Sequence, residues 1–352
     1  MKNLRCSFVF VFVLLTTMPT FAQDEYSLPE DRQTITVANA SEIAELATIE
    51  VEGVVDIALA PDGSILAYGS NADNLVHLVD LVSGEEFAAL PGHTYNVLDL
   101  AFSPDGSMLA TADTVFFGPP DGSVRLWDME TLEEIVVIQT ATVGGLVFNP
   151  SGTMLTGVVS VGVSSQIKLW DIPSGNELGE ITSSCRATFI PNGNLLATCL
   201  DDSILIWDLE TAQARATFNV SEDIITVVAV SPDGSSLATG DLSGTIRLWD
   251  VESGEELSVF EGYQGTISQV TFSPDGNLLA ARGQGHIQTI SGNNSTFTSL
   301  PADAVVRLWD LESEEQIALL GEEGGVREME FDAEWTLLAI VQGNMIRLWG
   351  VL

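Results

Sequence analysis

Positive charge is scarce in this sequence. Its 352 residues include 12 lysines and arginines against 50 aspartates and glutamates, and the formal net charge is −38. A surface this negative repels phosphate backbones and anionic membranes, so we expect no nucleic-acid partner. Mutual repulsion of like charges also keeps such a protein soluble. We therefore expect a monomer, and we interpret the acidity as a solubility feature rather than as a dedicated cation site.

Histidine and cysteine are equally scarce, with three of each in the chain. The histidines, His77, His93 and His286, lack the spacing of a metal-ligand cluster. The sequence also contains no calcium loop of alternating aspartates, no Gly-rich phosphate loop and no nucleophile elbow. We accordingly predict no metal, no cofactor and no catalytic residue, and hence a protein that is not an enzyme.

Long apolar runs are missing except near the N-terminus, where residues 8–15 are all apolar. Lys2 and Arg5 precede this run, and Ala22 provides a small residue at the cut site, which is the pattern of an export signal. The run is too short for an ordinary transmembrane span. We therefore expect cleavage after Ala22, which would change the net charge from −38 to −40, and a secreted or periplasmic protein with no membrane span in the mature chain. The alternative is an uncleaved signal that anchors the chain in a membrane.

Two short motifs each recur seven times along the chain. The first is a Pro-Asp-Gly turn or a variant of it, and its copies begin at Pro61, Pro104, Pro150, Pro191, Pro232, Pro274 and Ala333. The second is an alternating strand that ends in Trp-Asp, at Trp127-Asp128, Trp170-Asp171, Trp207-Asp208, Trp249-Asp250 and Trp309-Asp310, with Val79-Asp80 and Trp349-Gly350 as the altered first and last copies. The second motif is spaced by 48, 43, 37, 42, 60 and 40 residues. Proline presets the backbone of a turn and glycine accepts a positive φ, so each Pro-Asp-Gly predicts a hairpin.

Strands and turns at this spacing resemble the WD-repeat (WD40) family over roughly residues 43–352. The resemblance implies an all-β fold, a seven-bladed β-propeller of four-stranded antiparallel blades. Only three residues follow Trp349, so the last blade lacks its outermost strand, and we expect Ile43 to Ile49 to complete it. The domain prediction is a signal peptide over 1–22, a leader over 23–42 with a possible short helix capped by Thr36, and the propeller over 43–352.

The family resemblance also implies a structural hydrogen-bond network within a blade. Only blade two has every residue of it, namely His93, Thr111, Asp121 and Trp127. In blade five, Thr239 and Trp249 are present but Ser243 stands where the aspartate belongs. A histidine, an aspartate and a hydroxyl superficially resemble a hydrolase triad. We favour the structural interpretation, because tryptophan rather than a nucleophile ends the network.

Cys185 and Cys199 flank the Pro191-Asn192-Gly193 turn symmetrically. In a regular hairpin they would lie opposite each other on the first two strands of blade four, at a Cα separation of about 4.5–5.5 Å that permits a disulfide. Export makes oxidation plausible. We therefore predict a disulfide, with two buried thiols as the alternative.

The two faces of the predicted propeller differ in character. One collects acidic turns, with Glu85, Glu86, Glu133, Glu134, Glu255, Glu256, Glu314 and Glu315. The other carries two enlarged loops, at residues 116–120 and 283–302, and long loops on a rigid scaffold often bind partners. The candidate partner-binding residues on this loop-bearing face are Asn96, Leu98, Phe116, Phe117, Pro120, His286, Phe297 and Arg327.

Two functions follow from these observations. The first is a non-catalytic, exported scaffold that binds partner proteins, of unknown identity, through the loop-bearing face. The alternative is an exported propeller enzyme, or a protein that binds a small ligand or cation in the axial channel. Three or more carboxylates or histidines gathered at one mouth of that channel would favour the alternative.

Overall fold

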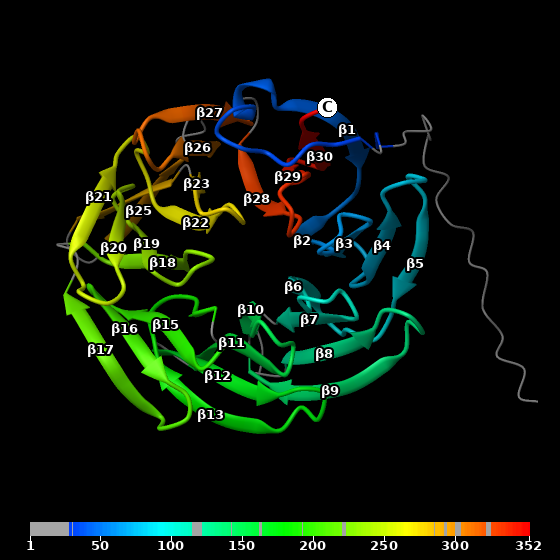
Figure 1. Ribbon diagram of the computed structural model, residues 1–352. Helices are drawn as coiled ribbons and strands as arrows, with labels where there is room; N and C mark the ends of the chain where they lie inside the picture. The colour runs from blue at the N-terminus through cyan, green and yellow to red at the C-terminus, as the bar shows by residue number, and fades with distance from the viewer. Residues whose placement is uncertain are drawn as a thin grey trace, which may run out of the picture.

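The computed structural model describes residues 28–29, 31–114, 122–141, 143–161, 164–191, 193–219, 223–284, 286–291, 294–299, 304–321 and 325–352. Seven four-stranded antiparallel sheets are arranged around one axis like the blades of a propeller (Figure 1). This confirms the predicted seven-bladed β-propeller. Each blade follows the chain from its innermost strand outward.

The first four blades each contain four strands in the order of the chain. Blade one is β2 (Val54–Leu59), β3 (Ile65–Ser70), β4 (Val76–Asp80) and β5 (Glu86–Leu90). Blade two is β6 (Asn96–Phe102), β7 (Met108–Thr114), β8 (Gly122–Asp128) and β9 (Glu134–Thr140). Blade three is β10 (Val143–Phe148), β11 (Met154–Val161), β12 (Ser164–Asp171) and β13 (Glu177–Thr182). Blade four is β14 (Thr188–Phe189), β15 (Leu195–Leu200), β16 (Ser203–Asp208) and β17 (Gln213–Asn219).

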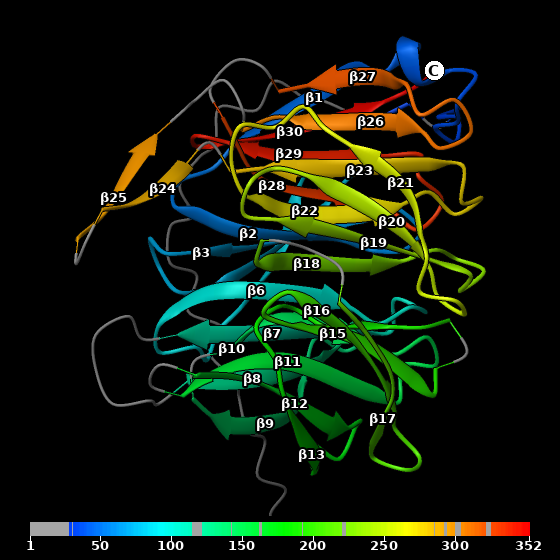
Figure 2. The same cartoon turned by 90° about the vertical axis from the view of Figure 1, so that its left-hand side faces the viewer.

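Blade five has the same strand order, and blade six contains an extra hairpin. Blade five is β18 (Ile225–Val230), β19 (Ser236–Asp241), β20 (Ile246–Asp250) and β21 (Glu256–Phe260). Blade six is β22 (Ile267–Phe272), β23 (Leu278–Gly283), β26 (Val306–Asp310) and β27 (Gln316–Leu320), and the hairpin of β24 (His286–Ser291) and β25 (Asn294–Ser299) is inserted in it. Figure 2 shows this hairpin projecting from one face of the propeller. The polar sequence of this insertion predicted a loop, but its backbone pairs as two strands.

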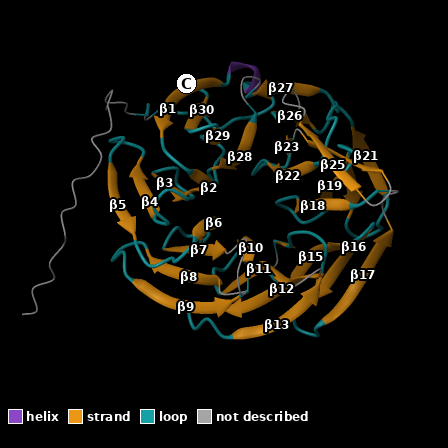
Figure 3. Ribbon diagram, turned by 180° about the vertical axis from the view of Figure 1, so that it is seen from behind, coloured by secondary structure: helices purple, strands orange, loops and turns teal. Residues whose placement is uncertain are grey.

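Blade seven closes the ring with both ends of the chain. It contains β28 (Val326–Phe331), β29 (Leu338–Gln342) and β30 (Met345–Gly350), and β1 (Ala44–Glu50) pairs antiparallel with β30 as its outermost strand (Figure 3). This is the closure that the sequence predicted, because only three residues follow Trp349. Closure removes a free sheet edge, which would otherwise be open to pairing with another chain.

The described part of the leader is not a simple linker. Leu28 and Ile35 are buried, with exposures of 4% and 1%, and Gln33 forms a β-bridge with Val351. A short 3-10 helix, η1 (Ala40–Glu42), follows Asn39, and the Thr36 side chain does not cap it. The apolar residues at 28 and 35 explain the difference, because they pack into the cores that blade seven shares with its neighbours.

The core lies between neighbouring blades. Leu78 of blade one, for example, packs with Val97 and Trp127 of blade two in one buried cluster. Burying a large apolar side chain contributes about 1.5–3 kcal/mol. A blade alone would leave one such face in water, so the fold depends on the complete ring.

A β-bulge recurs at the start of the innermost strands. The pairing register shifts at Val55, Leu98, Thr226, Ser268 and Arg327, six residues before the turn that follows each strand. A bulge re-aims the side chains that follow it. The residue after the bulge therefore occupies the equivalent position near the propeller axis in these five blades.

Candidate functional site

Blade two holds a buried chain of hydrogen bonds centred on Thr111. The Trp127 Nε1–H group donates to Thr111 Oγ1 at 3.0 Å, and His93 Nε2 lies 2.7 Å from the same oxygen. His93 Nδ1 lies 3.3 Å from Oδ2 of Asp113. When His93 carries its proton on Nδ1, the Thr111 hydroxyl donates to Nε2. The Nδ1–H group then faces the Asp113 carboxylate, but this contact is poorly aligned as a hydrogen bond.

The aspartate beside His93 is therefore Asp113. The residue assigned to this role from the sequence, Asp121, lies outside the described residues. Asp113 also accepts hydrogen bonds from the backbone of Ser123, at 2.6 Å, and of Thr94, at 3.2 Å. Burial raises the pKa of Asp113, but hydrogen bonds from His93 and Ser123 outweigh this effect and lower the pKa below its ordinary value. An ionised carboxylate thus joins the loop before β6 to the start of β8.

Blade five repeats part of this arrangement. Trp249 Nε1–H donates to Thr239 Oγ1 at 3.0 Å, and Asp241 accepts hydrogen bonds from the backbone of Ser243 and Thr245 at 3.0 and 2.9 Å. The aspartate again lies two residues after the threonine, not in the loop where Ser243 stands. A Thr-x-Asp pattern at the end of the second strand was the signal in the sequence that would have identified Asp113.

Hydrolase chemistry does not fit this network. Thr111 is fully buried at 0% exposure, and its oxygen already accepts the Trp127 N–H. A nucleophile must reach a substrate carbonyl, and it needs a base that is free to take its proton. The geometry therefore supports a structural role.

The structure joins Cys185 and Cys199 by a disulfide, with their Cα atoms 5.5 Å apart. The sequence predicted Cys185 on the first strand of blade four, and this was wrong. The β14 strand begins only at Thr188, so Cys185 lies before it. Ser183 replaces part of the regular pairing, since its hydroxyl donates to the carbonyls of Cys185 and Cys199, both at 2.9 Å. Cys185 occupies the position of the recurring bulge, six residues before Pro191.

One residue from each blade forms a ring around the propeller axis, which we call the axial ring. Its members, each five residues before the following turn, are Asp56, Asp99, Gly145, Arg186, Val227, Gln269 and Glu328. The Asp56 carboxyl interacts electrostatically with Asp99, Arg186 and Glu328, which come from three other blades. Only the axis brings these segments together.

Three members of the axial ring form hydrogen bonds with the backbone of the following blade. Asp56 accepts a hydrogen bond from Leu100 N at 2.8 Å, and Asp99 accepts one from Gly145 N at 2.6 Å. Gln269 Nε2 donates to the carbonyl of Met329 at 2.7 Å. Such bonds satisfy backbone groups on the edge of the innermost strands, which have no further strand to pair with.

Two arginines pair with carboxylates near the axis. Arg186 Nη2 lies 3.2 Å from Asp99 Oδ2, and Arg282 Nη2 lies 3.2 Å from Glu328 Oε2. The Asp99 charge raises the pKa of Arg186, whereas burial lowers the pKa of Arg282. Burial raises the pKa of Glu328 despite its arginine partner.

The carboxyl groups at the axis outnumber these arginines. Asp56, Asp99, Glu328 and Glu330 gather there, and burial raises the pKa of Asp56 well above its ordinary value. Among the described residues, no three histidine, cysteine, aspartate or glutamate side chains are placed to hold a metal ion. The sequence analysis missed this group, although charged residues within apolar innermost strands were a visible signal.

Comparison with known proteins agrees with this architecture. The pattern of the WD40 family (WD domain, G-beta repeat) matches residues 84–128, 174–208, 213–250 and 254–310. The chain belongs to the WD-repeat family. The four matches fall on blades that the structure shows independently.

Relatives of this WD-repeat protein share parts of its length. It is 26% identical over 208 residues to Pre-mRNA-processing factor 19 of Oryza sativa subsp. japonica, a match covering 54% of this chain and 37% of that protein. It is 24% identical over 193 residues to Angio-associated migratory cell protein of Homo sapiens, covering 53% and 42%. It is 28% identical over 146 residues to Small ribosomal subunit protein RACK1y of Oryza sativa subsp. japonica, covering 38% and 43%. The matched segment thus spans less than half of each relative.

The loop-bearing face of this WD-repeat protein is only partly described. Asn96 and Leu98 are half-buried on β6, and Arg327 is exposed on β28, where its guanidinium donates to the carbonyl of Val54 at 3.1 Å. His286 and Phe297 lie on the two strands of the inserted hairpin. The remaining predicted residues of this face, Phe116, Phe117 and Pro120, lie outside the described residues. Within the described ranges, no helix is long and apolar enough to cross a membrane.

The opposite, acidic face uses its aspartates internally. Asp128 accepts hydrogen bonds from the backbone of Glu130 and Thr131, at 3.0 and 2.8 Å, and these bonds lower its pKa. Asp250 accepts one from Ser253 N at 2.7 Å in the same type of turn. The Trp-Asp aspartates are therefore turn-forming residues, whereas Glu134 and Glu256 of this face pair with Arg125 and Arg247.

Proposed function

We propose that this WD-repeat protein is a non-catalytic scaffold that binds partner proteins through its loop-bearing face. The observation that carries the proposal is the contrast between a closed interior and an open face. His93, Thr111 and Trp127 satisfy one another inside blade two, whereas the β24–β25 hairpin projects from the propeller. A projecting hairpin of this kind can contact a partner without disturbing the core.

The relatives support a binding role. The name of one of them places it in the small ribosomal subunit, which is an assembly of many components. On the loop-bearing face, Ile224 is 48% exposed immediately before β18. An exposed apolar side chain on a largely uncharged face suits a protein partner, because interface cores are depleted in charge.

The test is affinity capture from the native secreted fraction. The bait is the full propeller, compared with a variant in which residues 284–301 are replaced by a short Gly-Ser linker. We expect the linker variant to lose captured proteins while a Glu314→Gln/Glu315→Gln variant of the acidic face keeps them. The opposite pattern would assign binding to the acidic face and refute this proposal.

We also propose export, with cleavage after Ala22 to give a secreted or periplasmic protein. The Cys185–Cys199 disulfide supports this, since such bonds persist in oxidising compartments. Intact-mass analysis of the native protein should show a chain that begins at Gln23. A full-length chain recovered with membranes would instead support an uncleaved anchor.

A second candidate function is small-ligand binding at the propeller axis. It is favoured by four carboxyl groups near the axis, those of Asp56, Asp99, Glu328 and Glu330. A cluster of three or more carboxylates there is the feature that we expected for this function and not for a scaffold. Asp56 and Asp99 are engaged with neighbouring backbone, so the ring is also structural. Glu330 makes no such bond among the described residues.

A further inference from the structure

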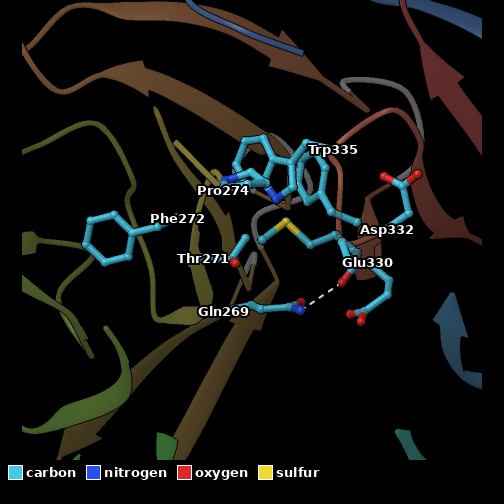
Figure 4. Close-up of a pocket in the computed structure, with 10 residues that line it drawn as sticks. Gln269, Thr271, Phe272, Pro274, Glu330, Asp332 and Trp335 are labelled. Carbon is cyan, nitrogen blue, oxygen red and sulfur yellow. Dashed lines mark hydrogen bonds between the residues drawn. The ribbon is translucent and has the colours of Figure 1, made fainter. Parts of the chain in front are cut away.

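A cavity of about 290 Å³ lies between the innermost strands of blades six and seven (Figure 4). Gln269 and Thr271 of β22 line one side, and Met329, Glu330 and Phe331 of β28 line the other. Its outer end is formed by the turns after these strands, at Pro274 and Trp335. The cavity therefore combines apolar walls with polar groups from two neighbouring blades.

Two acceptors in this cavity lack a partner among the described residues. The Gln269 amide N–H donates to the Met329 carbonyl at 2.7 Å, whereas the Gln269 Oε1 atom is buried and accepts no hydrogen bond. The Glu330 carboxyl has neither a hydrogen bond nor an ion pair there. Asp332 is not available in the same way, because its carboxyl accepts hydrogen bonds from Thr336 and Leu337. A buried acceptor without a donor costs about 1–3 kcal/mol, which a ligand N–H group would recover.

The charges around the cavity favour a cation. Arg186 and Arg282 are committed to Asp99 and Glu328, so neither neutralises Glu330. The chain as a whole carries a net charge of −38. A field of one sign raises the local concentration of ligands of the opposite sign.

We propose that this cavity binds a small organic ammonium ion. The ammonium group donates hydrogen bonds to Gln269 Oε1 and to the Glu330 carboxylate, and its apolar body packs against Met329 and Phe331. Phe331 stacks on Trp335 at 4.0 Å between ring centroids, which gives this wall a rigid backing. The inference rests on the second candidate function and names the ligand class for that site.

Proton release distinguishes this proposal from neutral binding. Burial raises the pKa of Glu330 to about 8, the nearby charges of Glu328 and Asp99 add to this, and Arg186 opposes it. Of the other strands beside it, β22 and β29 carry no titratable side chain, whereas β2 and β23, which pack against β28, carry Asp56 and Arg282. An ammonium ion ionises the carboxyl as it binds, so affinity should rise between pH 6 and about 8 and a proton should be released.

The experiment is isothermal titration calorimetry of the full chain with benzylammonium chloride, and with benzyl alcohol as the neutral probe of similar shape. Titrations at pH 7 in buffers of different ionisation enthalpy measure the released protons. Glu330→Gln keeps the shape of the side chain, and we expect it to weaken benzylammonium binding about tenfold, which is 1.4 kcal/mol, and to abolish proton release. Thr271→Val leaves the charge and should retain that release.

Glu134→Gln is the matched control, because Glu134 lies on the rim beside Arg125, far from the axis. It should bind benzylammonium as the wild type does. Circular dichroism verifies that each variant is folded. Equal affinity of wild type and Glu330→Gln for benzylammonium overturns the ligand class but leaves an axial site in place. Failure of both probes to bind the wild type overturns the ligand class and the second candidate function together.

Discussion

At the scale of single residues, the Thr111 hydroxyl is the centre of the hydrogen-bond network in blade two. It accepts the Trp127 N–H and bonds His93 Nε2, and His93 in turn reaches Asp113. The equivalent hydroxyl in blade five, Thr239, serves only Trp249. The two threonines are thus a natural pair for measuring the network.

We predict that Thr111→Val destabilises the protein more than Thr239→Val. Valine has nearly the same shape as threonine but no hydroxyl. In blade two it leaves Trp127 Nε1 and His93 Nε2 without a partner, and in blade five it leaves only Trp249 Nε1 without one. Each such group costs about 1–3 kcal/mol. Urea denaturation of both variants measures the difference, and equal losses of unfolding free energy would show that His93 gains nothing from the bond.

The Arg186 side chain passes close to Gly145 on its way to the Asp99 carboxylate, and a larger residue at position 145 would block it. Its φ is +66°, and an added Cβ would lie 2.7 Å from Arg186 Cγ. We predict that Gly145→Ala lowers the unfolding free energy by about 1–3 kcal/mol, since it combines a strained backbone with a clash. Gly179→Ala is the control, because no atom lies within 4 Å of its added Cβ. Similar denaturation midpoints for the two variants would contradict this role of Gly145.

At the scale of the element, the first two strands of blade four depend on a covalent link. The β14 strand contains only two residues, Thr188 and Phe189, and the Cys185–Cys199 disulfide holds the segment before it. In blade five the equivalent first strand is six residues long. The disulfide thus stands where regular pairing is weakest.

We predict that Cys185→Ser/Cys199→Ser lowers the unfolding free energy by about 3 kcal/mol, the expectation for a closed loop of about 15 residues. Dithiothreitol should destabilise the wild type by a similar amount and leave the double variant unchanged. Alkylation of the non-reduced mature protein should modify neither cysteine. Two alkylated thiols in that measurement would show that the bond is absent in solution.

For the whole molecule, the titration of the axis should govern stability near neutral pH. The folded state holds the pKa of Glu330 at about 8, against an ordinary value of 4.5, and the pKa of Asp56 is raised as well. Protonated Glu330 therefore stabilises the fold fully below pH 4.5, and this contribution is lost as the pH rises to about 8.

We predict that the free energy of unfolding decreases across this interval, by up to about 1.4 kcal/mol per pH unit for each proton. Glu330→Gln should flatten the decrease, since the amide does not titrate. Glu134→Gln should leave it unchanged. Denaturation series at several pH values measure the slopes, and identical slopes for wild type and Glu330→Gln would refute the assignment.

The sequence by itself determined the number of blades, the order of the strands and the closure by β1. These properties follow from local rules, because Pro-Asp-Gly turns and alternating strands act over a few residues and recur in register. The family resemblance implied that His93, Thr111 and Trp127 lie near one another. It did not identify Asp113, which contacts His93 from its position on β7.

Only the tertiary structure decided what meets at the axis. Asp56, Asp99, Arg186 and Glu328 are separated by dozens of residues, and the innermost strands that carry Asp56, Asp99 and Glu328 each contain a bulge that composition does not reveal. Likewise, the cavity beside Glu330 exists only because β22 and β28 come from adjacent blades of a closed ring. Side-chain contacts across the axis depend on how the seven blades meet there, and local sequence patterns do not specify these distances.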